Sequence, residues 1–407
     1  MRTFFTTLGL SALTLSLLAC QSRVQNPPLP LSSANNLRMQ GVDTQPIDDS
    51  DLSGGFRPQV ASRLASEVVH TLGEIQVFAA QTQMNSAPLP QNTGLTLQGA
   101  LDFVDRKGMT QPAAMAKASL VNAQGQVVAS AETQADGRWQ MQAPAPGTYQ
   151  VRYTLENRYW NLKNYAWNGP TVQAGQSGDA GLTTLTPGSE NAKAAWIHDV
   201  YLQAMALFAR ENVPLNWWQR QIQTVWPGRG NYYLSDTVNL TGAEQWDVNG
   251  HEVGHAIYHQ ALNAASRGGQ HKIDDCYHDT LALSEGFASF FSAAVHLEKN
   301  DPDARFDQYL VPRRAPIRIE NVPEDVCAGP ANEWRVSAVF WDIYDQHGDG
   351  ENLSVGLRTI FEALGRNNRP TVRSVTEAQG LIQELIPPSE HGQLAQVFRQ
   401  NKMLTTP

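Results

Sequence analysis

The distribution of apolar residues divides the chain into stretches of different character. Residues 8–19 form an uncharged, leucine-rich run behind a positively charged start. A run of this length is too short to cross a bilayer as a helix and is typical of a secretion signal. We therefore predict a signal peptide over residues 1–19. The polar residues that follow predict a tether over residues 20–92, with one helix predicted over residues 60–80.

Residues 93–186 carry an alternating pattern of apolar and polar positions. Short apolar runs recur with turn dipeptides between them, such as Asp136-Gly137 and Pro146-Gly147. Large residues such as Trp139, Tyr149 and Val151 follow the turns and share one face of each expected strand. Short strands separated by turn signals in this way predict a small β-sandwich.

Residues 187–407 show mainly the period of helices. The expected second domain is therefore mainly helical, with a small sheet formed by an edge strand, and the whole chain is expected to be a multidomain α+β protein. The strand is predicted over residues 230–240, and helices are predicted over residues 191–210, 246–262, 281–295 and 332–345.

Composition and charge narrow the classes of function. The chain has 407 residues, of which 41% are hydrophobic and 17% are charged, and these values fit an ordered protein of more than one domain. The net charge of -9 argues against non-specific nucleic-acid binding, which needs a basic surface. We therefore expect no nucleic-acid partner.

The end of the predicted signal peptide contains a motif for lipid attachment. The residues Leu17-Leu18-Ala19-Cys20 resemble a bacterial lipobox, in which cleavage leaves the cysteine as an acylated N-terminus. The resemblance implies a protein held at a membrane by lipid on Cys20, outside the cytoplasm. The residue after Cys20 is Gln21, whereas an aspartate at that position would oppose sorting to the outer membrane. We therefore expect the protein at the cell envelope, and at the outer membrane if the cell has one. The alternative is an ordinary signal peptide that ends near a cysteine.

The remaining cysteines, Cys276 and Cys327, would share the oxidising compartment that export implies. A disulfide between them is then expected. The alternative, a pair of thiolate metal ligands, lacks the close cysteine spacing that such sites use.

The strongest chemical signal is His251-Glu252-Val253-Gly254-His255 within the predicted helix 246–262. Residues four apart lie one above the other on a helix, so both imidazoles can bind one zinc ion. Glu252 lies beside the first ligand and can reach water on the metal rather than the metal itself. The motif therefore predicts a catalytic zinc ion, with His251 and His255 as ligands and Glu252 as the general base.

A catalytic zinc site needs a third protein ligand and one open position. Glu285 is the one charged residue in the apolar segment 281–295. A lone carboxylate on such a helix is costly to bury without a partner, and a zinc ion is a sufficient partner. We predict Glu285 as the third ligand. The alternative is a carboxylate near a helix start that faces solvent or the helix dipole.

This combination resembles the zinc site of the gluzincin metallopeptidases, in which HExxH is followed on a second helix by a glutamate, here Glu285-Gly286-Phe287-Ala288. The resemblance implies zinc-dependent hydrolysis of peptide bonds. In the thermolysin-like branch, a carboxylate four residues after the ligand glutamate supports a zinc-binding histidine. Ser289 stands at that position here, so the supporting group must differ.

The predicted sandwich also resembles a known family. The pattern Thr133…Asp136-Gly137-x-Trp139…Pro146-Gly147-x-Tyr149-x-Val151 is similar to transthyretin-like, carboxypeptidase-regulatory-like domains of secreted bacterial proteins. In that pattern the glycines serve turns and the aromatic residues fill the core. The resemblance therefore implies a structural or spacer domain over residues 93–186, with ligand binding as the alternative.

The group that stabilises the oxyanion is not fixed by the motif. Tyr258, His278, Arg335 and Tyr344 are the candidates for contacts to the substrate or the transition state. Arg335 could bind a carboxylate or carbonyl of the substrate. It could equally take part in a cap or an ion pair that holds its own helix.

We expect a zinc metallopeptidase, with one catalytic zinc ion and a protein or peptide as substrate. Two alternatives stay open. One is a non-catalytic, zinc-stabilised surface module that serves adhesion or envelope architecture, and the other is a zinc hydrolase of envelope peptide crosslinks. Glu252 favours an enzyme, because a structural zinc site needs neither a general base nor an open position.

Overall fold

We describe the protein from a computed structural model. The structure describes residues 95–175, 178–306, 314–348, 350, 352–365 and 370–403. The predicted signal peptide, the lipidation site Cys20, and the tether with its helix lie outside the described residues. None of the helices in the described part is both long and apolar enough to span a membrane.

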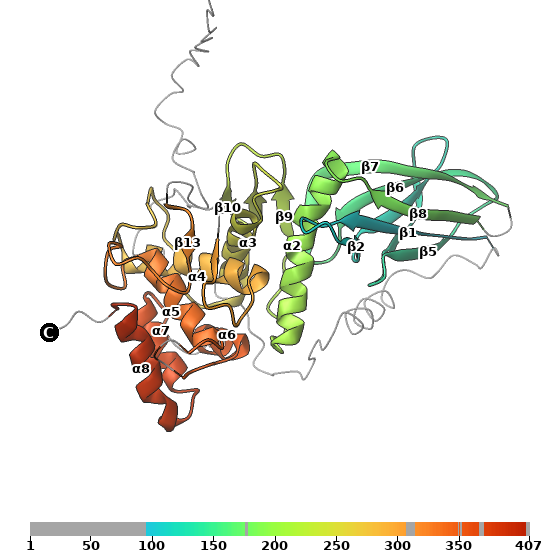
Figure 1. Ribbon diagram of the computed structural model, residues 1–407. Coiled ribbons are helices and arrows are strands. Elements are labelled where there is room, and N and C mark those ends of the chain that lie inside the picture. Colours follow the sequence, from blue (N-terminus) through green and yellow to red (C-terminus); the bar gives the residue numbers. More distant parts are fainter. Residues whose placement is uncertain are drawn as a thin grey trace, which may run out of the picture. The chain divides into compact units, whose positions relative to one another are not determined.

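The strands between residues 96 and 185 belong to two sheets (Figure 1). In the four-stranded sheet, β1 pairs with β2 and β5 in antiparallel fashion and with β8 in parallel. The seven-stranded sheet has the order β10-β11-β9-β7-β6-β3-β4. The strands of this region are β1 (Thr96–Val104), β2 (Thr110–Pro112), β3 (Lys117–Val121), β4 (Val127–Glu132), β5 (Arg138–Gln142), β6 (Gly147–Glu156), β7 (Trp160–Ala174) and β8 (Gly178–Leu185).

The alternating pattern in the sequence becomes alternating burial in these strands. Every second residue is buried along much of β1 and β6. Trp139 of β5 and Tyr153 of β6 are buried, and the Trp139 indole N–H donates to the Tyr153 hydroxyl at 3.2 Å. The predicted turn at Asp136-Gly137 is present. Gly137 has a φ of +77°, and a Cβ there would lie 2.5 Å from the carbonyl oxygen of Leu101, so the turn requires glycine.

The seven-stranded sheet continues past residue 186, where we predicted a domain boundary. β9 (Ile222–Val225) lies parallel to the start of β7, with Trp160 opposite Ile222. β11 (Thr237–Asn239) and β10 (Tyr232–Leu234) extend the sheet further. The single strand predicted over residues 230–240 is wrong, because Ser235 and Asp236 adopt positive φ values of 48° and 60° and turn the chain into a hairpin.

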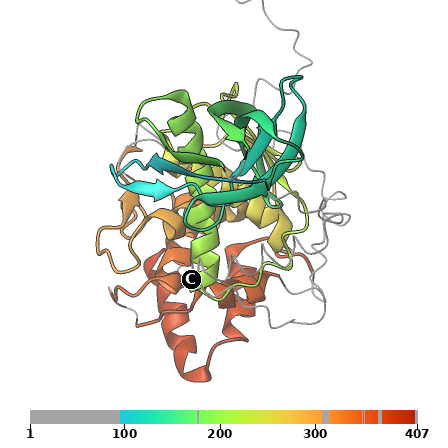
Figure 2. The same ribbon diagram turned by 90° about the vertical axis from the view of Figure 1, so that its right-hand side faces the viewer.

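The other elements are mainly helices, and the prediction of a mixed α+β fold is confirmed. α2 contacts β7 on one side and α3 and α4 on the other. Figure 1 shows it between the strands and the remaining helices, and in Figure 2 the strands cross in front of it. The remaining elements are α2 (Glu190–Arg210), α3 (Trp246–Ala261), α4 (Asp279–His296), β12 (Arg305–Phe306), β13 (Ile317–Arg318), α5 (Glu333–Tyr344), α6 (Leu357–Leu364), α7 (Val375–Gln383), η3 (Pro388–Glu390) and α8 (His391–Gln400).

α2 illustrates how the sequence sets an element and its packing. The Ser189 side chain accepts from the backbone N–H of Ala192 and caps the helix start. His198, in the middle of the helix, is buried between Trp160 and the backbone of Ala114. Its Nδ1 accepts from the Trp160 indole at 2.9 Å, and its Nε2–H donates to the Ala114 carbonyl at 2.7 Å. Both contacts tie α2 to the strands.

Candidate metal centre

Two helices bring the site together, because glycines let them approach closely. α3 carries His251, Glu252 and His255, and α4 carries Glu285. A Cβ added to Gly254 would lie 2.9 Å from both the Cα and the carbonyl oxygen of Ala288 on α4. These distances are shorter than any side chain tolerates, so the backbones of the two helices are in direct contact. The residues one turn away on each helix are thereby held face to face.

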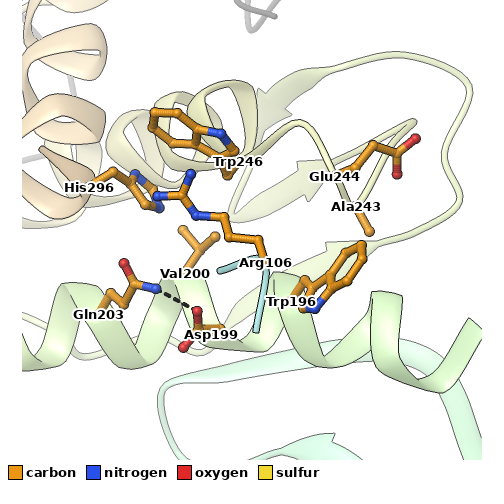
Figure 3. A pocket seen from close by; sticks show the side chains of 9 residues that line it. All are labelled: Arg106, Trp196, Asp199, Val200, Gln203, Ala243, Glu244, Trp246 and His296. Atoms are coloured by element: carbon orange, nitrogen blue, oxygen red, sulfur yellow. Dashed lines mark hydrogen bonds between the residues drawn. The ribbon is translucent and has the colours of Figure 1, made fainter. Parts of the chain in front are cut away.

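The start of α3 is held from another direction. The guanidinium carbon of Arg106, from the loop after β1, lies 3.9 Å from the centroid of the Trp246 ring (Figure 3). The same ring contacts His296 at the end of α4, with centroids 4.9 Å apart. The cavity among these side chains measures about 10 Å³, room for at most one water molecule. We therefore interpret the Arg106 contact as one that fixes the first turn of α3.

The three side chains predicted as ligands converge on one point. Nε2 of His251, Nε2 of His255 and Oε2 of Glu285 lie 3.1 Å from one another in all three pairs. All three side chains are buried. A hydrogen atom can join only one pair of these atoms, whereas one cation can contact all three. Ligand atoms of a tetrahedral metal with bonds of 2.0–2.1 Å are about 3.3 Å apart, close to the observed spacing. These residues could hold a metal ion.

The protonation expected of the His251 imidazole suits a cation. Burial lowers the pKa of His251 to about 4, so its ring is neutral and can offer a lone pair. Nδ1 of His251 lies 3.1 Å from the Ser289 hydroxyl. With Nε2 directed at the centre, Nδ1–H donates to this oxygen and fixes the orientation of the ring. The hydroxyl of Ser289 thus occupies the supporting position for which the sequence offered no carboxylate.

Glu252 is buried beside His251, His255 and Glu285 but takes no part in the contacts among them. Its side chain is fully buried, and neither carboxylate oxygen has a hydrogen-bond partner among the described residues. Burial, and then the negative charge of Glu285, raise the pKa of Glu252 well above its ordinary value. A buried carboxylate without a partner costs stability, and the fold keeps one at this position.

His271 is a residue that the sequence reasoning missed. It lies in the loop between α3 and α4, and its side chain is only 5% exposed. Nε2 of His271 lies 3.9 Å from Oε2 of Glu285, and Nδ1 lies 2.5 Å from Oε2 of Glu333 on α5. Burial lowers the pKa of His271, but the charges of Glu333 and Glu285 outweigh it and raise the pKa to about 9. A loop residue belongs to no helical pattern of apolar positions. The one signal for His271 in the sequence is therefore its position between the HExxH motif and the segment of Glu285.

The four residues predicted to contact the transition state make their hydrogen bonds elsewhere. The Tyr258 hydroxyl donates to the carbonyl of Ala265, and the Tyr344 hydroxyl donates to Glu211. The Arg335 guanidinium donates to the backbone carbonyls of residues 323, 326 and 327. His278 is exposed, and its Nδ1 accepts from the backbone N–H at position 280 and caps α4.

The predicted disulfide between Cys276 and Cys327 is confirmed, and its Cα atoms are 5.7 Å apart. It joins the loop of His271 to the segment before α5. Asn332 reinforces this link, because its side-chain amide donates to the carbonyls of Ile273 and Asp275 at 2.9 Å. The loop of His271 and the start of α5, which carries Glu333, are therefore held together.

Two more groups of side chains in the described part could hold a metal ion. One consists of His271, Glu285 and Glu333. The other consists of Glu320, Asp345 and His347, where Glu320 accepts hydrogen bonds from the Trp341 indole at 2.7 Å and from Nδ1 of His347 at 2.9 Å. These hydrogen bonds satisfy both oxygens of Glu320 without a cation.

No family model and no curated protein matches the chain. Among solved structures, a 9R-lipoxygenase from Cyanothece PCC8801 aligns with 34% of this chain and 27% of its own length. The sequence identity is 11% and the TM-score is 0.16. A likeness this low carries no argument about fold or activity, so the functional conclusion depends on the site itself.

Proposed function

We propose that the protein is a zinc-dependent hydrolase of peptide bonds, with His251, His255 and Glu285 as metal ligands and Glu252 as the general base. The observation that carries the proposal is the buried Glu252, with both oxygens unpartnered in the described part, beside three equidistant ligand atoms. A structural metal site has no use for such a group. A hydrolytic site needs one to take a proton from water.

The donor set favours zinc. Two imidazole nitrogens and one carboxylate oxygen form the protein ligands of known catalytic zinc sites, and the fourth position stays open. A zinc ion held there supplies a Lewis acid that polarises a carbonyl and makes water more acidic. The glutamate ligand on a second helix is the reason for assigning the chain to the gluzincin type.

The protein groups account for the movement of protons. One oxygen of Glu252 takes a proton from the attacking water, and the same oxygen returns it to the leaving amine nitrogen. Because burial and Glu285 raise the pKa of Glu252, this carboxylate is a better base than an exposed one. Ser289 keeps the His251 ring from rotating during the reaction.

The setting of the enzyme is part of the proposal. The proposed location is the cell envelope, with an anchor through Cys20. The lipobox-like end of the predicted signal peptide supports it, and the disulfide is consistent with export. The strands before residue 186 are assigned to the immunoglobulin-like or transthyretin-like class of sandwich, and residues 187–407 to the peptidase part. The expected substrate is a protein or peptide outside the cytoplasm.

The test compares the wild-type protein with Glu252→Gln, each loaded with zinc and assayed on fluorescein-labelled casein. We expect both to bind one zinc ion per chain by elemental analysis, and the variant to lose at least about 100-fold in kcat. Glu298→Gln, an exposed carboxylate after α4, serves as the matched control. Zinc-loaded wild-type protein that cleaves neither casein nor cell-wall peptides would favour the non-catalytic scaffold. Cleavage of cell-wall peptides alone would favour the crosslink hydrolase.

A further inference from the structure

We infer that the cavity between the turn after β1 and the helix α2 binds an organic cation, an ammonium group on an apolar stem, and that Asp199 binds its charge. The cavity measures about 340 Å³, and none of the residues proposed for the metal centre lines it. Pockets that hold small molecules begin at about 300 Å³, so one ligand has room. The inference goes beyond the proposed function, because it requires neither a metal ion nor catalysis.

The walls of the cavity are held by hydrogen bonds within the protein. In the turn after β1, Oδ1 of Asp105 accepts from the backbone N–H groups of Lys107 and Met109 at 2.9 and 2.8 Å. The opposite wall is α2, whose Trp196 indole donates to the carbonyl of Val104 at the end of β1 at 2.8 Å. A site that is formed before its ligand arrives loses little conformational entropy on binding.

Half of the twelve residues that line the cavity are apolar. Met109 is 60% exposed at this surface, and Leu202 and Ala206 of α2 are only partly buried. An apolar stem in the cavity covers them and is favoured in proportion to the area removed from water. The apolar lining residues are Met109, Pro112, Ala114, Ala135, Leu202 and Ala206.

The charge of the ligand is set by Asp199, which lies on α2 and is partly buried. Its Oδ2 accepts from the Gln203 side chain at 2.5 Å (Figure 3). Burial raises the pKa of Asp199 to about 6, although the bond from Gln203 and the charges of Arg106 and Lys107 act against the rise. These contacts therefore leave part of the cost of burying the carboxylate without compensation. An ammonium group beside Asp199 would supply it.

The two cationic residues of the cavity do not make it a site for an anion. The charge of Arg106 already interacts with three carboxylates, those of Asp199, Asp247 and Asp105. An anion at Arg106 would be repelled by Asp199 and Asp105, which line the same cavity. Lys107 is exposed, and an ion pair at an exposed position contributes little. A cation is therefore the charge that this cavity favours.

The experiment measures binding to the metal-free full chain by fluorine NMR, with three probes of one shape at about pH 7.5, where Asp199 is ionised. We expect para-fluorophenethylamine to bind with a Kd of about 1 mM or tighter. The alcohol with a hydroxyl in place of the ammonium should bind at least about 10-fold more weakly, because it makes no charged hydrogen bond. The carboxylate, para-fluorophenylpropionate, should bind more weakly still.

Two variants locate the binding. Asp199→Asn keeps the shape of the side chain and removes its charge, so its affinity for the amine should fall to that for the alcohol. Ala206→Leu fills the cavity and should weaken the binding of all three probes. Glu298→Gln, an exposed carboxylate after α4, is the matched control and should bind the amine as the wild type does. Urea midpoints check that each variant folds, and the probe series on the wild type decides the charge of the ligand if a variant does not.

The ammonium could belong to a free amine or to a lysine side chain of a peptide. Displacement of the bound amine by acetyl-glycyl-lysyl-glycinamide, and not by its norleucine analogue, would support the site with a peptide as its ligand. Failure of both peptides to displace the amine would support the site with a free amine as its ligand.

Four results would overturn the inference. They are no binding of the amine at about 10 mM, binding of the carboxylate as tight as that of the amine, wild-type affinity in folded Asp199→Asn or Ala206→Leu, and binding of the amine to the zinc-loaded chain alone. The last result would mean that the amine binds the metal. Absence of peptidase activity would leave the expected binding unchanged, so the two proposals fail separately.

Discussion

The close contact between α3 and α4 gives the sharpest structural prediction, for the substitution Gly254→Ala. Gly254 lies between His251 and His255, the two histidines proposed as metal ligands, and is not a candidate ligand itself. Its Cα faces the backbone of Ala288, and α4 at that point is three residues beyond Glu285. The substitution adds one methyl group to the tightest contact between the two helices.

The size of the effect follows from the distances. The new Cβ would lie 2.9 Å from Ala288, and ordinary contacts begin at 3.4 Å, so α4 must retreat by about 0.5 Å. Glu285 retreats with it, whereas metal–ligand distances tolerate changes of about 0.2 Å. We expect zinc affinity to fall by about 10–100-fold. Overpacking should also lower the free energy of unfolding of the metal-free protein by about 1–3 kcal/mol, partly offset by the better helix propensity of alanine.

Zinc affinity is measured by competition with a chromophoric chelator, and stability by urea denaturation without metal. Gly380→Ala is the matched control. Gly380 lies in α7, is exposed, and a Cβ there would meet no atom within 4 Å. This control should leave zinc affinity unchanged and stabilise the protein by about 1 kcal/mol.

Wild-type zinc affinity in Gly254→Ala would refute the reasoning, because the contact would then not determine where Glu285 lies. A loss of zinc affinity of the same size in Gly380→Ala would point instead to a general loss of rigidity.

The remaining predictions concern the third ligand and acid stability. Glu285→Ala should bind zinc at least about 100-fold more weakly and lose activity in parallel, as measured by chelator competition and casein cleavage, and retention of zinc would remove Glu285 from the site. Burial lowers the pKa of His198 to about 4, below its ordinary value of 6.5. The folded state therefore binds fewer protons than the unfolded state below pH 6.5, so stability is complete above that pH and is lost as the pH falls toward 4. We expect this group to remove about 2 kcal/mol between pH 7 and 4.5, and the difference in urea midpoints between these two pH values should shrink in His198→Asn. An unchanged difference would show that His198 does not titrate in this way.

The grouping of His251, His255 and Glu285 was accessible from the sequence because each part obeys a local rule. Two histidines four apart share a helix face whatever surrounds them. A single carboxylate in an apolar helix needs a partner when it is buried. Both rules act within one helix, so neither requires knowledge of the tertiary structure.

Features that depend on distant pairing were not accessible. β7 pairs with β9, which lies about sixty residues later, and no local pattern marks the parallel register of Trp160 with Ile222. The hairpin between β10 and β11 turns at Ser235-Asp236, which lacks the glycine by which such turns are recognised. Tyr258 and Arg335 were candidates for contacts to the transition state, with a cap or an ion pair in its own helix as the alternative for Arg335. The tertiary fold uses those donors for backbone carbonyls of neighbouring loops.

Glu252 carries weight as evidence of chemistry because it departs from the usual state of buried polar groups. Such groups in folded proteins are normally satisfied, and Tyr258 and Arg335 follow that rule. Glu252 does not, because neither of its carboxylate oxygens has a hydrogen-bond partner in the described part. If the site served stability alone, replacing Glu252 by an apolar residue would remove a cost. This cost supports the proposed role of Glu252 as a base.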